Sequence, residues 1–146
     1  MADYEISSER GRMDVAAIHA FLTRTYWARG IPLETVQRAI ENSLCFGVFQ
    51  GEAQVGFARV ITDQATFAYL AGVYLLDEHR GKGLARRLVQ AVLAHPRLQG
   101  LRRWLLVTRD AHALYRPHGF EPVAHPDRIM EIHRPDAYLL PGRPPP

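Results

Sequence analysis

Two glycines within a run of basic residues are the first feature of this chain that could do chemistry. Residues 77–88 read DEHRGKGLARRL, so Gly81 and Gly83 alternate with Arg80 and Lys82, and a helical hydrophobic pattern follows. The first N–H groups of a helix lack internal partners and lie at the positive end of its dipole, so a glycine turn leading into a helix can bind an anion. The local sequence leaves two interpretations open, a phosphate cradle or the solvated start of a surface helix.

The residues that follow these glycines exclude two common phosphate-binding motifs. A P-loop requires a Lys-Ser/Thr pair after its last glycine, but Leu84 and Ala85 stand there. The dinucleotide fingerprint GxGxxG requires a third glycine, where this chain has Arg86. The pattern that remains is [Q/R]-x-x-G-x-[G/A], formed by residues 80–85.

A second motif follows the next predicted strand. Residues 108–120 read TRDAHALYRPHGF, which fits the pattern N-x-x-A-x-x-x-Y-x-x-x-G-F except that Thr108 replaces the Asn. The positions that match in register are Ala111, Tyr115, Gly119 and Phe120. With the glycine loop and the strand VYLLDEHRG that leads into it, residues 44–131 resemble the GNAT superfamily of acetyl-CoA-dependent N-acetyltransferases.

The resemblance implies an acetyl-CoA site centred on the glycine loop. In this family two neighbouring parallel strands splay apart and the pantetheine arm fills the gap, which here implies strands at 67–76 and 103–108. Gly72 is placed for a bulge beside the thioester, and the 3′-phosphate would lie towards Lys82. The implied cofactor-binding residues are Val73, Tyr74, Leu75, Arg80, Gly81, Lys82, Gly83, Leu84, Ala85, Thr108 and Asp110.

The resemblance places Tyr115 at the position of the general acid. Acetyl transfer to a neutral amine expels a thiolate, and a positioned acid helps the sulfur depart because a free thiol has a pKa of about 8.5. The alternative for Tyr115 is a half-buried aromatic ring with its hydroxyl in solvent. Thr108 in place of Asn would make that residue's contact with the cofactor shorter or absent.

The general base is left open by the sequence. Residues 65–76 contain no Asp or Glu, although many relatives carry a carboxylate on this strand. A water chain, Asp63, or one of the histidines His112 and His118 could accept the proton, although the sequence favours a surface position for each histidine. No grouping of His and carboxylates has the spacing of a metal site, so no metal is expected.

Aromatic residues near the N-terminal helices are candidates for the acceptor site. Tyr26, Trp27 and Tyr69 could form a wall for an apolar or cationic acceptor, or could be ordinary core and rim aromatics. Arg29 and Arg59 could instead bind an acceptor carboxylate, and the sequence does not choose between these options. The acceptor is expected to be a small-molecule or protein amine.

The hydrophobic pattern predicts helices interleaved with a central sheet. Asp14 is a predicted N-cap, Pro32 can open a helix, and residues 51–53 predict a hairpin turn. The predicted helices are 14–24, 33–42, 84–95 and 111–116; the predicted strands are 43–50, 54–62, 65–76, 102–109, 117–123 and 128–133, with a further strand at 4–7. The fold class is α/β (α+β), and the resemblance implies a GNAT-like mixed sheet with a splayed acyl-CoA cleft.

Length and composition favour an ordinary globular domain. The chain has 146 residues, 47% hydrophobic, with a formal net charge of +3 and its basic residues dispersed, which argues against nucleic acid as a partner. We expect one acetyltransferase domain at 1–140 and a Pro-rich tail at 141–146. The lone Cys45 is interpreted as a buried apolar residue, and the absence of a membrane span or signal core predicts a cytoplasmic protein without a membrane partner.

Two functions from different classes fit this sequence. The first is an N-acetyltransferase, for which the family resemblance makes a homodimer possible. The second is a non-catalytic acyl-CoA-binding module that regulates a partner, which the missing strand carboxylate and Thr108 leave room for. Tyr115 favours the enzyme, because a pure sensor needs no general acid.

Overall fold

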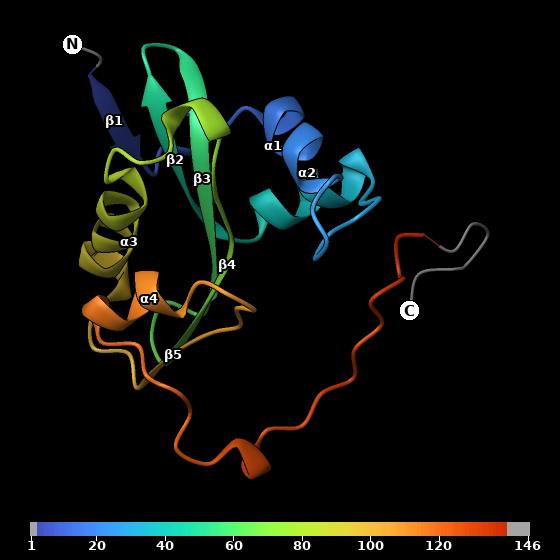
Figure 1. The fold of residues 1–146 in the computed structure, drawn as a ribbon, viewed down its shortest axis with the longest axis vertical. Coiled ribbons are helices and arrows are strands. Elements are labelled where there is room, and N and C mark those ends of the chain that lie inside the picture. Colours follow the sequence, from blue (N-terminus) through green and yellow to red (C-terminus); the bar gives the residue numbers. More distant parts are fainter. Residues whose placement is uncertain (1–2, 140–146) are drawn as a thin grey trace.

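The computed structural model describes residues 3–139, in which five strands form one mixed sheet between two groups of helices (Figure 1). The strands lie in the order β1-β2-β3-β4-β5, and all neighbours are antiparallel except β4 and β5, which are parallel. Their bounds are β1 Tyr4–Ser7, β2 Leu44–Gln50, β3 Ala53–Thr62, β4 Phe67–Leu75 and β5 Arg103–Leu106. The predicted strand at 4–7 and the predicted β2–β3 hairpin are confirmed.

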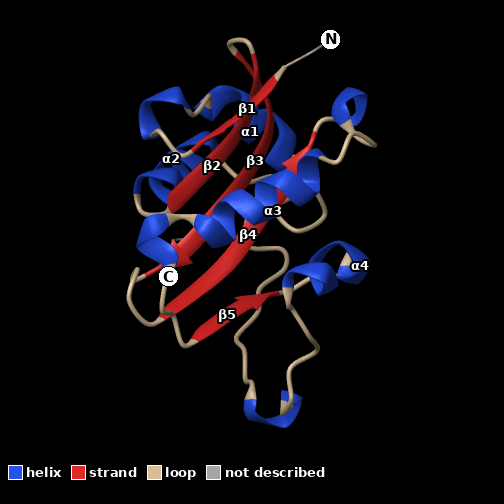
Figure 2. Cartoon of the chain, turned by 90° about the vertical axis from the view of Figure 1, so that its left-hand side faces the viewer, coloured by secondary structure: helices blue, strands red, loops and turns tan. Residues whose placement is uncertain are grey.

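The helices cover opposite faces of this sheet. Helices α1 (Val15–Leu22) and α2 (Leu33–Glu41) lie on one face, and α3 (Leu84–Ala94) lies on the other with the short α4 (His112–Tyr115) beside it (Figures 1 and 2). The predicted N-cap is confirmed, since Asp14 Oδ1 accepts a hydrogen bond from the Ala17 amide at 3.0 Å.

Two apolar clusters, one on each face, hold the sheet between the helices. The α3 side of the core includes Leu88 and Val92, and the α1/α2 side includes Ile18 and Phe57. Burial on both faces explains why the segment that forms β4 is almost uncharged, as the sequence predicted.

The parallel strands β4 and β5 separate part of the way along β4. Their pairing runs from Phe67↔Arg103 to Leu70↔Leu106, and β4 then continues to Leu75 without β5 beside it. Gly72 has φ +63°, and the β3–β4 register shifts between Phe57 and Arg59, so the predicted bulge lies where the two strands diverge. The predicted splayed cleft is thereby confirmed.

Two predicted strands are wrong. Residues 117–123 and 128–133 form no strand, and the segment from 121 to 139, here called the arm, is exposed throughout. A strand exists only with a neighbour to accept its hydrogen bonds, and the arm leaves the sheet through a 3-10 turn at Pro126–Arg128 (Figure 1). These segments have the residue pattern of strands, but among residues 3–139 the sheet ends at β5.

Two further sequence predictions concern the chain's ends and its relation to membranes. The Pro-rich tail predicted at 141–146 lies outside the described residues. Between residues 3 and 139, no helix combines the length and apolar character needed to span a membrane.

Candidate active site

The glycine loop presents a row of free backbone N–H groups in front of α3. Gly81 and Gly83 have φ +75° and +76°, a region that strongly favours glycine, and the helix begins at Leu84. Within the described chain, none of the amides from Gly81 to Arg86 donates to a protein acceptor. A Cβ on either glycine would meet nothing within 4 Å, so this concave row of donors is open to an anion.

The two basic side chains of the loop behave differently. Arg80 is held against the end of β4, because its Nε donates to the Leu75 carbonyl at 3.1 Å and Nη1 lies 2.9 Å from Asp77 Oδ1. Lys82 forms no ion pair in the described part of the chain, and its Nζ lies 5.8 Å from the centre of the Tyr4 ring. Lys82 is therefore the more available charge for a phosphate group.

The β4 residues at the splay offer backbone rather than side-chain contacts to the cleft. Tyr74 turns its ring towards α1, where it stacks on Phe21 with ring centres 3.8 Å apart, and burial raises its pKa. Val73 packs against the α3-side core, and Leu75 is buried in it. The side chain of Tyr74, one of the predicted cofactor-binding residues, therefore lies in the core and away from the cleft.

Tyr115 combines a buried ring with a free hydroxyl. Its residue is only 8% exposed, and its ring packs edge-on against Phe120. The hydroxyl has no hydrogen-bond partner among residues 3–139, yet it is not sealed from solvent. Burial raises the pKa of Tyr115, which keeps this hydroxyl protonated and able to donate.

Thr108 positions the helix that carries Tyr115. Its Oγ1 accepts the Ala111 amide at 3.0 Å, and Ala111 is the residue just before α4, so the hydroxyl holds the connection between β5 and the helix. Asp110, also predicted to bind cofactor, is exposed in the same connection. This local bond could have been found in the sequence, because Thr hydroxyls commonly bond nearby backbone groups in turns.

A cavity of about 120 Å³ lies on the α1/α2 side of the sheet and reaches the β4 bulge. Its walls are mainly apolar, and its lining joins α1, α2, β3 and β4 to the distal end of the arm. The lining residues are Ile18, Leu22, Trp27, Ala28, Ile31, Val36, Ala39, Ile40, Phe57, Arg59, Ala71, Gly72 and Tyr138. Gly72 lines the cavity and also lies at the point where β4 and β5 separate. The cavity and the splayed cleft therefore meet at this residue.

Arg59 is the charged group of this cavity. Its Nη1 donates to Ser43 Oγ at 3.1 Å, but no described carboxylate pairs with it. Burial lowers the pKa of Arg59, and the groups that oppose this shift are Cys45, Tyr138 and Tyr69. A half-buried guanidinium without a carboxylate partner favours an anionic ligand in this cavity.

The predicted aromatic wall is only partly assembled in the cavity. Trp27 lines it, while Tyr69 lies on β4 close enough to influence Arg59. Tyr26 is 55% exposed and stacks under Arg109, whose guanidinium lies 3.9 Å from the ring centre. This contact joins the loop after α1 to the connection after β5, and no pattern in the sequence indicated it.

The structure narrows the choice of general base. Asp63 accepts the amides of Ala65, Thr66 and Phe67 and the Thr66 hydroxyl, and these bonds hold its pKa well below the usual range. A carboxylate that is stabilised in this way is a poor base. Asp63 instead holds the turn between β3 and β4 in place.

The histidines and the cysteine differ in what surrounds them. His112 is exposed on α4, whereas His118 is half-buried with an enclosed Nε2 that lacks a partner among the described groups. His19 contacts the Ile31 carbonyl at 3.0 Å, consistent with a structural role. Cys45 is buried, as predicted, and burial raises its thiol pKa to about 11, which makes it a poor nucleophile.

Comparison with known proteins agrees with this splayed sheet and its glycine loop. Residues 15–120 match the Acetyltransferase (GNAT) family, and the chain belongs to that family of acetyl-CoA-dependent acyltransferases. No group of three or more potential metal ligands occurs in residues 3–139.

Individual relatives carry general acetyltransferase names. FG08082 of Gibberella zeae, provisionally named an acetyltransferase, is 34% identical over 136 residues, covering 77% of this chain and 76% of that protein. A crystal structure of the GNAT-family protein xcc2953 from Xanthomonas campestris is 50% identical with a TM-score of 0.93, covering 96% of this chain and 99% of that one. A Clostridium acetobutylicum protein solved with acetyl-CoA shares the fold, at 15% identity, TM-score 0.66 and coverage of 91% and 96%.

Proposed function

We propose that this protein is an N-acetyltransferase that moves the acetyl group of acetyl-CoA directly to a primary amine, with Tyr115 as the general acid. The observation that carries the proposal is a buried, protonated tyrosine on the helix that follows the splayed strand β5. Such a hydroxyl can donate a proton to a departing sulfur.

The chain's own residues fit the proposed cofactor. The free amides from Gly81 to Arg86 would hold the pyrophosphate, and Lys82 would add charge beside them. From Ala71 to Leu75, β4 is paired with β3 but has no β5 beside it, so this side of the strand offers backbone groups to the extended pantetheine arm. When bound there, acetyl-CoA would supply the acetyl group as a thioester.

The proposed acceptor is an amine that also carries a carboxylate and a small apolar group. Arg59 would bind the carboxylate, and the apolar walls beside Trp27 would enclose the rest. The cavity meets the cleft at Gly72, so an amine anchored on Arg59 would lie near the thioester end of the cleft. This orientation would make Arg59 the main determinant of acceptor choice.

Proton removal from the amine is assigned to solvent. Asp63 is committed to its turn, and β4 carries no carboxylate. An amine with a pKa near 10 is mostly protonated at neutral pH, so the rate should rise with pH as the neutral amine becomes more abundant.

A thiol-release assay tests the proposed function. Acetyl-CoA is offered with matched pairs of amines, each pair consisting of an apolar amino acid and the amine that lacks its carboxylate. We expect release well above hydrolysis, with the carboxylate-bearing member preferred. Tight acetyl-CoA binding without any amine-dependent release would instead support the non-catalytic acyl-CoA-binding module.

A further inference from the structure

Tyr26 and Trp27 form an exposed aromatic pair at the tip of the loop between α1 and α2. Their rings meet edge to face with centres 5.1 Å apart. The loop beneath them is held in place, because Thr25 Oγ1 donates to the Leu22 carbonyl at 2.7 Å and accepts the Ala28 amide at 3.2 Å. Trp27 also lines the proposed acceptor cavity, so this pair lies at the edge of the site where an amine would bind.

A cation already covers one face of this aromatic pair. Cζ of Arg109 lies 3.9 Å from the centre of the Tyr26 ring, well within the roughly 6 Å over which a cation is attracted to an aromatic face. Arg109 forms no ion pair with a carboxylate among residues 3–139, although Asp110 follows it in the chain. The position that a cationic group of a ligand would take on Tyr26 is therefore held by the protein's own guanidinium.

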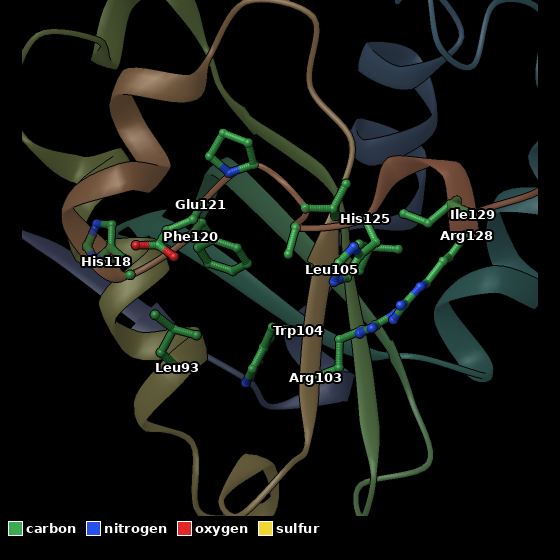
Figure 3. A pocket seen from close by; sticks show the side chains of 14 residues that line it. Leu93, Arg103, Trp104, Leu105, His118, Phe120, Glu121, His125, Arg128 and Ile129 are labelled. Atoms are coloured by element: carbon green, nitrogen blue, oxygen red, sulfur yellow. The ribbon is translucent and has the colours of Figure 1, made fainter.

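This stacking does not follow simply from an arginine lying near aromatic rings. Beside the outer edge of β5, Arg103 and Arg128 line a hollow of about 490 Å³ together with Trp104 and Phe120 (Figure 3). Neither of these two guanidinium groups lies over an aromatic ring in the described part of the chain. The contact of Arg109 with Tyr26 is therefore a particular feature of the acceptor side of the molecule.

The other charges close to the aromatic pair are also positive. Residues 23–32, which form the loop, contain Arg24 and Arg29 but no Asp or Glu, and both arginines are exposed. The charged group inside the cavity is Arg59. An acceptor carboxylate would be attracted by this set of charges, whereas a second positive group on the acceptor would be repelled and would find the Tyr26 face covered.

We propose that Arg109 is a specificity-determining residue that excludes acceptors with a second positive charge by covering the face of Tyr26. This inference rests on the proposed function and deepens it, because it makes the acceptor a monoamine whose remaining charge is negative. An exposed cation–π contact and a like-charge repulsion at the surface each change an equilibrium by a few-fold, so together they can select by about 10-fold.

A matched pair of acceptors tests this selection. Norleucine and Nε-trimethyllysine share the α-amine, the carboxylate and a four-carbon side chain, and they differ in a terminal quaternary ammonium group that cannot be acetylated. In the thiol-release assay we expect the unmodified protein to prefer norleucine in kcat/KM by about 10-fold. Arg109→Ala should reduce this preference at least about 5-fold, and Arg109→Lys, which retains a cation, should keep most of it.

Arg29→Ala is the control for the charge of the loop. Arg29 is an exposed arginine of the same loop and has no cation–π contact among the described residues, so its removal should leave the preference in place. An equal loss of preference in Arg29→Ala and Arg109→Ala would assign the selection to net charge and overturn the role of the covered ring. An unmodified protein that uses both acceptors equally, or an unchanged preference in Arg109→Ala, would overturn it as well.

A binding measurement separates this inference from the proposed function. Tetramethylammonium is titrated into protein labelled with 5-fluorotryptophan, whose two fluorine signals belong to Trp27 and Trp104 and are assigned with Trp27→Phe. The Trp27 signal should shift saturably in Arg109→Ala, but neither in the unmodified protein nor when Tyr26→Leu is added, and acetyl-CoA binding checks that each variant is folded.

The two measurements can fail independently. A Trp27 signal that does not respond to tetramethylammonium in Arg109→Ala would overturn the inference even if acetyl transfer proceeds. A saturable shift in Arg109→Ala without CoA release from any amine would uphold the covering of Tyr26 and count against the proposed function alone.

Discussion

The proposed cofactor loop leads into α3 on one face of the sheet, and the proposed acceptor cavity lies on the α1/α2 face, and the two are formed by different kinds of groups. The loop from Gly81 to Arg86 offers backbone amides and depends on two positive φ angles. The cavity around Arg59 is formed by side chains from four elements and the distal end of the arm. In the proposed function, recognition of the cofactor would therefore depend on backbone conformation, whereas recognition of the acceptor would depend on side chains that substitution can readily change.

The largest effect on acetyl-CoA binding is expected for a substitution in the glycine loop, and a matched control distinguishes a blocked anion site from backbone strain. Gly83→Val should weaken acetyl-CoA binding at least about 100-fold, because a branched side chain disfavours φ +76° and would project into the open anion site. Gly100→Val is the matched control, since Gly100 has φ +74° and equally open surroundings but lies after α3. Calorimetric titration of both variants with acetyl-CoA compares them, and equal losses would show that strain alone is responsible.

Tyr115→Phe should lower turnover by about 100-fold and leave acetyl-CoA affinity nearly unchanged. Tyr74→Phe is the control, because that buried ring faces α1 and away from the cleft. Since burial raises the pKa of Tyr115 and the group must be protonated to act, its contribution is present at neutral pH and lost only above its ordinary pKa of about 10. Steady-state rates from pH 6 to 10.5 measure this, and unchanged turnover in Tyr115→Phe would exclude the general-acid role.

Arg59→Met should raise the acceptor KM by about 10- to 100-fold for amines with a carboxylate, because a charged hydrogen bond of roughly 1.5–3 kcal/mol is lost. The matching amines without a carboxylate should change little. Arg29→Met removes the other arginine that the sequence offered, and because Arg29 is exposed it should have little effect. An equal rise for both amine classes in Arg59→Met would indicate a damaged cavity rather than a lost charge contact.

The smallest effect on turnover is expected for a substitution in the connection between β5 and α4. Thr108→Val removes the acceptor of the Ala111 amide, which should cost about 1 kcal/mol and lower turnover several-fold by loosening the connection that leads into α4. Thr108→Ser keeps the hydroxyl and should restore most of the rate. Thermal unfolding and kcat measured together test this, and a rate loss that Ser does not restore would contradict the role of this hydroxyl.

The glycine loop and the cavity also differ in how well the sequence predicted them. The loop was predictable because positive φ angles favour glycine and because the motif around Tyr115 stands in register downstream. The cavity was predictable only in part: Trp27 was a candidate that does line it, but the sequence could not choose between Arg29 and Arg59. That choice depends on burial, which distant elements decide and which has no local pattern.

The incorrect strands at 117–123 and 128–133 have a related cause. Alternation in the sequence reports the side-chain surface that a strand would present, but a strand also needs a partner for its backbone. No sequence pattern indicated the contacts of Tyr138 and Arg109, because these contacts join segments that lie far apart in the chain. Turns, caps and helices were predictable from local sequence, whereas the presence of a strand partner and the contacts of Tyr138 and Arg109 were not.

The position of Tyr138 gives the arm a consequence for selectivity. This residue is at once one wall of the cavity beside Arg59 and a contact of the exposed arm with the body, because a Cβ on Gly30 would lie 3.3 Å from the Tyr138 carbonyl oxygen. A change in the arm that displaces Tyr138 would open that wall, while no described contact joins the arm to the glycine loop. Such a change should therefore broaden the range of amines accepted at constant cofactor affinity.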